Sequence, residues 1–252
     1  MPTAITSFTA ADTVGSLVAQ CPALSRVFEQ AGIDYCCGGK IPLAEACRRK
    51  GFDPQQILTQ LEAAGAVTSG GGVDPSQMSL TELADHIVAT HHAYLKMELP
   101  RLEAMTTKVA RVHGDGDVRL PQVNQVLLGL QAAMTSHMDK EEQILFPLIR
   151  ELEASATAPE FHCGSLANPV RVMELEHDQA GGALVKLREL TDGFTSPDWA
   201  CNTYRAMLDA LAHLEHDLYD HIHKENNILF PRAIALETSK QSQTCPDHPV
   251  SL

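Results

Sequence analysis

The sequence predicts an all-α fold in which a small helical domain is followed by an up-down four-helix bundle. Aromatic residues are only 5 % of the chain, while Ala, Leu, Glu and Gln are plentiful and alternating β-branched runs are scarce. In the second part of the chain, four long helical stretches are joined by modest loops. With 252 residues, 44 % of them apolar, the chain can bury a core of this kind.

A linker is predicted at residues 67–79, "VTSGGGVDPSQMS", which combine three glycines with Pro, Asp and Ser and have no periodic apolar pattern. It separates a helical domain, residues 1–66, from the bundle, residues 80–237. The first domain is small enough to need further contacts for much of its stability. Residues 238–252 are expected to form a polar, frayed tail.

The four helices of the bundle can be placed from their start and stop signals. Ser79 and Glu82 form a capping box that opens the first helix, which can run to about Arg111 before "HGDGD" ends it. Loops with Gly and Pro, "ASATAPEFHCGSLANP" and "GFTSP", separate the later helices. Those later helices are expected over roughly residues 119–153, 169–192 and 198–236.

Charge and hydropathy exclude several classes of protein. The net charge of −13, without any Lys/Arg cluster, argues against nucleic-acid binding, which needs a positive surface. No apolar run approaches the roughly 18 residues of a membrane span, and the first residues lack the charged n-region of an export signal. We therefore expect a cytoplasmic protein. Its seven cysteines, an odd number, are expected to be thiols rather than a disulfide framework.

Two segments of the bundle are nearly alike: "HMDKEEQILFP" from His137 and "HIHKENNILFP" from His221. In each, a glutamate follows the histidine by four residues, Glu141 and Glu225, so both side chains lie on one helix face, about 6 Å apart along the axis. A single pair of this kind is more often a solvated helix face. Here both pairs are embedded in apolar sequence, where an imidazole and a carboxylate are costly to bury unless a metal compensates them.

The other two helices each offer a further imidazole. The first contains the adjacent His91 and His92, between which helical phase does not decide, and the third contains His177. His92 precedes His137 by 45 residues and His177 precedes His221 by 44, which indicates two similar helical hairpins. Four His and two Glu suit two redox-active iron ions bridged by the carboxylates better than a structural zinc, although manganese would also tolerate them. The histidines expected to have no ligand role are His86, His113, His213, His216 and His223.

The residues of both parts resemble a known family. The bundle resembles hemerythrin-like di-iron domains, and the whole chain resembles the RIC (repair of iron centres) proteins, whose N-terminal domain carries a "DYCCGGK"-like motif, here residues 34–40. The resemblance selects His92 over His91. It implies a di-iron centre with glutamate bridges and, in the oxidised form, an oxo bridge, in a hemerythrin-like fold. The implied ligands are His92, His137, Glu141, His177, His221 and Glu225.

One position departs from the oxygen-carrying hemerythrins. Those proteins have a further histidine four residues beyond the third-helix ligand, where this chain has Gly181, followed by Gly182. Its loss leaves an iron position open or filled by solvent, with room for nitric oxide or dioxygen. The alternative explanation of the two glycines is close packing of helices.

The adjacent Cys36 and Cys37 are expected to act as redox or iron-handling thiols, because neighbouring cysteines rarely chelate one metal together. Lys40 could lower the pKa of a nearby thiol, and the two glycines permit a sharp turn. The alternative is that both are small buried hydrophobic residues. The remaining cysteines carry no motif; Cys21 and Cys47 are expected in the core, and Cys163, Cys201 and Cys245 near loops or the tail.

The resemblance implies repair of iron-sulfur clusters damaged by nitrosative or oxidative stress, by iron donation or by processing of nitric oxide. Its implied partners are damaged iron-sulfur proteins, the gases NO and O2, and a second copy of the chain in a homodimer. Three alternatives stay open: an oxygen or nitric oxide sensor or store, a nitric oxide reductase, and a helical bundle that binds adventitious metal.

Overall fold

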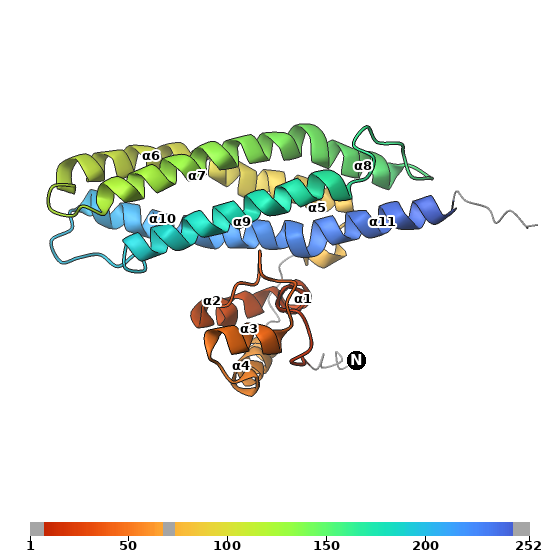
Figure 1. Cartoon of the computed structure of the whole chain (residues 1–252), viewed down its shortest axis with the longest axis horizontal. Helices are drawn as coiled ribbons and strands as arrows, with labels where there is room; N and C mark the ends of the chain where they lie inside the picture. Colours follow the sequence, from red (N-terminus) through yellow and green to blue (C-terminus); the bar gives the residue numbers. More distant parts are fainter. Residues whose placement is uncertain (1–7, 68–73, 244–252) are drawn as a thin grey trace, which may run out of the picture. The chain divides into compact units, whose positions relative to one another are not determined.

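The computed structural model describes residues 8–67 and 74–243, and its regular structure in these ranges is helical (Figure 1). Within these ranges no β-strand forms, and an isolated bridge joins Thr13 to Pro42. The all-α prediction is confirmed. By its internal contacts the chain divides into two units, Met1–Met78 with Ile222–Phe230, and Ser79–His221 with Pro231–Leu252. Residues 68–73 of the predicted linker and residues 244–252, which make up most of the predicted tail, lie outside the described residues.

In the described part of residues 1–78, the first unit contains six helical elements: α1 Val14–Gln20, η1 Pro22–Leu24, α2 Ser25–Ala31, α3 Leu43–Lys50, α4 Pro54–Val67 and η2 Pro75–Gln77. Thr13 caps α1 through its side chain, which accepts from the N–H of Ser16. Helix α2 ends at Gly32 in the left-handed region, with φ 61°, a conformation that glycine adopts without strain. The core of this unit includes the fully buried Leu17, Phe28 and Leu61.

The second unit is built on four long helices that run as α5–η3–α6, α7–η4–α8, α9 and α10–η5–α11 (Figure 1). By internal contacts, residues 222–230 of the last of these helices are grouped with the first unit. The predicted capping box is confirmed: Ser79 Oγ accepts from the Glu82 N–H, and the Glu82 carboxylate accepts from the Ser79 N–H. The bounds are α5 Leu80–Ile87, η3 Val88–His92, α6 Ala93–His113, α7 Leu120–Lys140, η4 Glu141–Leu145, α8 Phe146–Ala154, α9 Ala167–Leu190, α10 Asn202–Lys224, η5 Glu225–Leu229 and α11 Phe230–Gln243.

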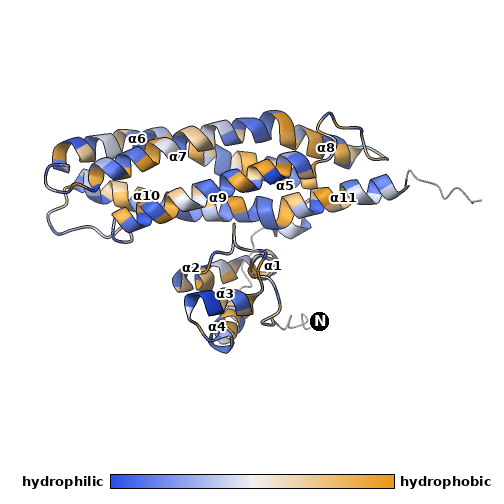
Figure 2. Ribbon diagram, viewed as in Figure 1, coloured by the Kyte–Doolittle hydropathy of each residue, from blue (hydrophilic) through white to orange (hydrophobic). Residues whose placement is uncertain are grey.

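The interior of the bundle is apolar over most of its length. Hydrophobic residues recur along each helix between hydrophilic ones, as Figure 2 shows, which is the pattern of a helix with one buried face. Buried side chains from the different helices include Leu95, Leu127, Phe146, Leu184 and Leu218. None of the helices within residues 8–67 and 74–243 combines the length and the apolar character needed to cross a bilayer.

Three of the four long helices contain a turn of π-helix, η3, η4 and η5. In η4 and η5 the N–H of the following phenylalanine, Phe146 or Phe230, bonds the carbonyl five residues earlier, on Glu141 or Glu225. A proline comes next in each case and lacks the N–H that an α-helix requires, which favours a change of register just before it. The repeated "ILFP" therefore marks the end of a widened turn, a feature common at functional sites.

Candidate metal centre

All six predicted ligand residues lie on the long helices and are buried. His92 closes η3, His137 and His221 lie near the ends of α7 and α10, and His177 lies in the middle of α9. Glu141 and Glu225 are each the first residue of a π turn. Each of the six is at most 1 % exposed, so four imidazoles and two carboxylates are removed from water together. Such burial is costly without a compensating charge.

The six side chains form two groups that could each hold a metal ion, and within a group the ligand atoms lie within 4.8 Å of one another. Glu141 and Glu225 belong to both groups. Two nitrogen and two oxygen donors in each group, with no sulfur, suit iron or manganese better than a structural zinc. The first group is His92, Glu141, His221 and Glu225; the second is His137, Glu141, His177 and Glu225.

Glu141 lies between imidazoles from two helices. Its Oε2 is 3.2 Å from His137 Nε2 and 3.4 Å from His92 Nε2. His137 Nε2 is also 3.0 Å from His177 Nε2. Three ring nitrogens and a carboxylate oxygen thus converge, which is the arrangement expected of atoms that share cations.

The outer nitrogens of two of these histidines are held by further carboxylates. His92 Nδ1 is 2.8 Å from Glu142 Oε1, and His137 Nδ1 is 3.0 Å from Glu176 Oε2. Because an ionised carboxylate only accepts, each Nδ1 carries the proton and donates it, and a neutral ring then offers its Nε2 lone pair inward. Two inward lone pairs beside the Glu141 carboxylate would repel it, and a cation between them removes the repulsion. The residues therefore fit a metal.

Glu142 and Glu176 are themselves fixed by lysines, Lys96 and Lys140. Partial burial alone would raise the pKa of the Glu142 carboxyl, but hydrogen bonds from Lys96 and His92 outweigh it and hold that pKa below its usual range. The pKa of Glu176 is lowered in the same way by Lys140 and His137. Both carboxylates are absent from the sequence-based prediction, although each directly adjoins a predicted ligand in the sequence, Glu141 or His177.

His91, the open alternative to His92, lies outside both groups. Its Nδ1 is 2.9 Å from Asp217 Oδ1, and its ring stacks on that of His221, with centroids 5.3 Å apart. His213 and His216, expected without a ligand role, are exposed.

Gly182 is exposed, and a Cβ there would meet no atom within 4 Å. Close helix packing, the alternative given for the two glycines, therefore does not explain Gly182. Gly181 lies one helical turn beyond His177 and is half-buried.

In the first unit, the Cys36 and Cys37 pair is organised by Asp34. Asp34 Oδ1 accepts from the N–H groups of Cys36 and Cys37 at 2.9 and 3.0 Å, and Oδ2 accepts from the N–H of Gly38 at 2.9 Å. Cys36 is buried and Cys37 half-buried, with their sulfurs 3.8 Å apart. Asp34, Cys36 and Cys37 also form a third group that could hold a metal ion.

The suggestion that Lys40 lowers a thiol pKa is wrong for Cys36. The hydrogen bond with Cys37, burial and the nearby Asp34 carboxylate all raise the pKa of Cys36 well above its usual range. Cys36 is therefore a neutral thiol at pH 7.

The same unit includes residues 222–230, whose Asn227 binds the double-cysteine loop. Asn227 Nδ2 donates to the carbonyls of Tyr35 and Cys36 at 3.3 and 3.0 Å. A Cβ on Gly39 would lie 2.4 Å from the Tyr35 carbonyl oxygen and 2.6 Å from Asn227 Oδ1, so only glycine permits this approach. Gly39, the second glycine of the "CCGGK" motif, is therefore required by close packing as well as by the predicted turn.

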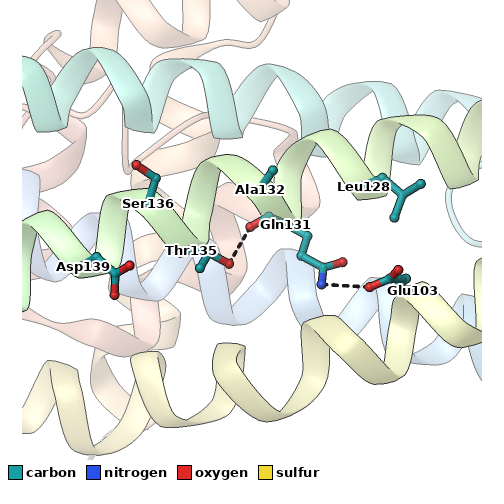
Figure 3. A pocket seen from close by; sticks show the side chains of 7 residues that line it. All are labelled: Glu103, Leu128, Gln131, Ala132, Thr135, Ser136 and Asp139. Carbon is teal, nitrogen blue, oxygen red and sulfur yellow. Dashed lines mark hydrogen bonds between the residues drawn. The ribbon is translucent and has the colours of Figure 1, made fainter.

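A surface hollow of about 490 Å³ lies on α6 and α7, away from the ligand side chains. Figure 3 shows two hydrogen bonds at its edge, from Gln131 Nε2 to Glu103 Oε2 at 3.0 Å and from Thr135 Oγ1 to the Gln131 carbonyl at 2.8 Å. None of its lining residues belongs to either ligand group. It gives no reason to place the chemistry outside the buried cluster.

Comparison with known proteins gives matches to both parts of the chain. Residues 83–233 match the hemerythrin HHE cation binding domain, and residues 10–65 match a domain of unknown function, DUF542, also called ScdA_N. The chain is 39 % identical over 224 residues to the iron-sulfur cluster repair protein YtfE of Escherichia coli O157:H7 and to that of Shigella boydii serotype 4 (strain Sb227). The similar region covers 89 % of this chain and 97 % of each relative.

Proposed function

The chain belongs to the hemerythrin-type iron-sulfur cluster repair family, and on that premise we propose that it is a di-iron protein that helps to restore iron-sulfur clusters damaged by nitrosative or oxidative stress. It acts in the cytoplasm, as a homodimer, on damaged iron-sulfur proteins. Glu141 and Glu225 would be carboxylate ligands shared by its two irons, and the oxidised pair would also carry an oxo group. The gases NO and O2 are its small ligands.

The observation that carries the proposal is that both ligand groups share the same two glutamates. Two separate metal sites would need separate carboxylates, whereas a bridged pair needs carboxylates that reach both ions. Six protein side chains would leave room at two irons for a small ligand, and Gly181 occupies the sequence position at which the oxygen-carrying hemerythrins have a further histidine.

The irons, when bound, supply redox chemistry and open positions for a small gas, or are themselves released to a client cluster. The side chains of the protein orient the ligands and exclude water. Glu142 and Glu176 hold the outer nitrogens of His92 and His137, so that the inner nitrogens face the ligand groups and would bind the metals. The burial of all six ligands keeps bulk water from the site.

Cys36 and Cys37 take part in handling the iron or the electrons of repair. Cys36 stays a neutral thiol, and Cys37 is the more exposed of the two, so Cys37 is the sulfur that meets a client. This division of roles accounts for the two adjacent cysteines whether or not the group of Asp34, Cys36 and Cys37 holds a metal ion.

The test begins with anaerobic purification, elemental analysis of iron per chain and the near-ultraviolet absorption after air oxidation, for the wild type and for Glu225→Ala. We expect near two irons per chain in the wild type and loss of both iron and the oxo-to-iron absorption in the variant. Glu151→Ala, on the exposed side of α8, is the matched control and keeps both. An unchanged spectrum in Glu225→Ala contradicts the bridged centre.

Repair is then measured by reactivation of a nitric oxide-damaged iron-sulfur enzyme. The wild type restores activity, and a Cys36→Ala/Cys37→Ala variant with full iron content does not. Reversible gas binding without any reactivation would instead indicate a sensor or store. Multi-turnover release of nitrous oxide would indicate a reductase.

A further inference from the structure

We propose that Cys201 and His113 form a nucleophilic thiol site, separate from the metal groups and from Cys36 and Cys37, that exchanges with small disulfides of the glutathione class. Cys201 Sγ is 3.3 Å from His113 Nε2. Of the six cysteines in the described ranges, Cys201 is the one classed as exposed. A thiol that is both open to solvent and in contact with an imidazole is the arrangement that makes cysteines reactive.

The Cys201 thiol also lies at the start of a long helix. The Cys201 carbonyl accepts from the N–H of Arg205 at 3.0 Å, so Cys201 stands at the start of the 23-residue helix α10. The free N–H groups of a helix N-terminus carry partial positive charge and stabilise an anion there. Arg205 also donates to the carbonyls of Asp198 and Ala200, at 2.9 and 3.1 Å, which holds the loop that presents the thiol.

The imidazole is held in place by aromatic rings. The His113 ring stacks on Tyr204, with centroids 6.1 Å apart, and lies against Trp199, with centroids 5.7 Å apart. Trp199 is 54 % exposed, although large aromatic residues are usually buried, and it offers an apolar surface beside the imidazole. The imidazole comes from α6, the helix end from α10 and the indole from the loop before α10, so the site is a tertiary feature rather than a local motif.

The exchange balances without any other reactant. His113 Nε2 takes the proton of the Cys201 thiol, and the thiolate attacks one sulfur of the small disulfide. A new S–S bond forms to Cys201, the original S–S bond breaks, and the departing thiolate takes the proton back from the imidazolium. The products are one mixed disulfide and one free small thiol, and an excess of small thiol reverses the step.

The site is far from the ligands along its own helix. Cys201 precedes His221 by 20 residues on α10, which at 1.5 Å per residue is about 30 Å. Modification of Cys201 therefore leaves the ligand side chains untouched, and iron content serves as an independent control.

The experiment treats the iron-loaded, full-length protein with glutathione disulfide near neutral pH and follows each cysteine by peptide mass spectrometry. We expect Cys201 to react about tenfold faster than Cys163, a half-buried loop thiol, with iron per chain unchanged. His113→Gln should slow Cys201 about tenfold and leave Cys163 as it was. Equal rates at the two cysteines, or no effect of His113→Gln, overturn the proposal.

Two further measurements test whether the reactivity of Cys201 depends on His113. Neutral iodoacetamide should select Cys201 to the same degree, because His113 contacts the attacking sulfur itself. Selectivity for the disulfide alone would overturn the role of His113. If His113→Gln unfolds the loop, Trp199→Leu loosens the imidazole without removing it. That variant should slow Cys201 by a smaller factor while circular dichroism stays unchanged, and an undiminished rate counts against the site.

Discussion

The two ligand groups share their carboxylates but differ in what surrounds their imidazoles. In the second group, the ring nitrogens of His137 and His177 already face each other at 3.0 Å. In the first group, His92 and His221 meet edge to face, with ring centroids 5.0 Å apart, and each ring is backed by another, Phe146 or His91. The duplicated hairpins thus supply the same ligand types twice, while the surrounding residues make the two positions unequal.

The largest expected effect comes from the carboxylate that joins the groups. Glu141→Gln keeps the size of the side chain but removes its charge from both groups at once, so we expect loss of both irons rather than one. Elemental analysis of iron per chain measures this, with Glu151→Gln as the matched control on the same long helix. One iron retained at full occupancy would mean that the groups are independent and that the glutamate does not bridge.

A smaller effect should separate the two groups. Glu142→Gln and Glu176→Gln each remove an ionised acceptor from one histidine, His92 or His137, and each should weaken iron binding about 10- to 100-fold. Competition with an iron chelator gives the affinities. We expect each variant to release one iron first and to change the near-ultraviolet spectrum. If both variants release both irons equally and at the same time, the different surroundings of the two groups do not affect how tightly each group binds iron.

Features that depend on local sequence patterns could be predicted from the sequence, and features that depend on contacts between distant residues could not. The bundle, the capping box at Ser79 and the inward face of the His-Glu pairs are local patterns, fixed by helical periodicity, and they could be read directly. The choice between His91 and His92 could not, because η3 is a π turn and shifts the phase that a regular helix would give.

Side chains that meet from different helices could not be predicted from the sequence, for a different reason. Glu142 meets His92 across 50 residues of sequence, and His113 meets Cys201 across 88. Neither pairing produces a periodic pattern in the sequence, because single contacts between helices depend on the packing angles of the helices rather than on the spacing of residues along the chain. The sign of the pKa shift at Cys36 was missed likewise, because it depends on burial and on the side chain of Asp34 folding back on the loop.

The smallest effect concerns the lysines outside the cluster. Lys96→Met removes the cation from Glu142, whose side chain is 26 % exposed, and should lower the free energy of unfolding of the iron-free protein by about 0.5–1 kcal/mol at pH 7. Since the pKa of Glu142 is lower in the folded protein than in the unfolded chain, its stabilising contribution is present above the unfolded value, about 4.3, and is lost as pH falls through the folded value. The difference between wild type and Lys96→Met should therefore shrink towards zero in acid.

Urea unfolding of the iron-free chain at pH 7 and at about pH 3 measures that difference directly. Lys186→Met is the matched control, because Lys186 forms an exposed ion pair with Glu189 within α9. It should change stability less at pH 7. If Lys96→Met lowers the free energy of unfolding equally at both pH values, the lysine acts through the packing of its methylenes rather than through the charge of Glu142. The support that Glu142 and Lys96 give to His92 is then steric instead of electrostatic.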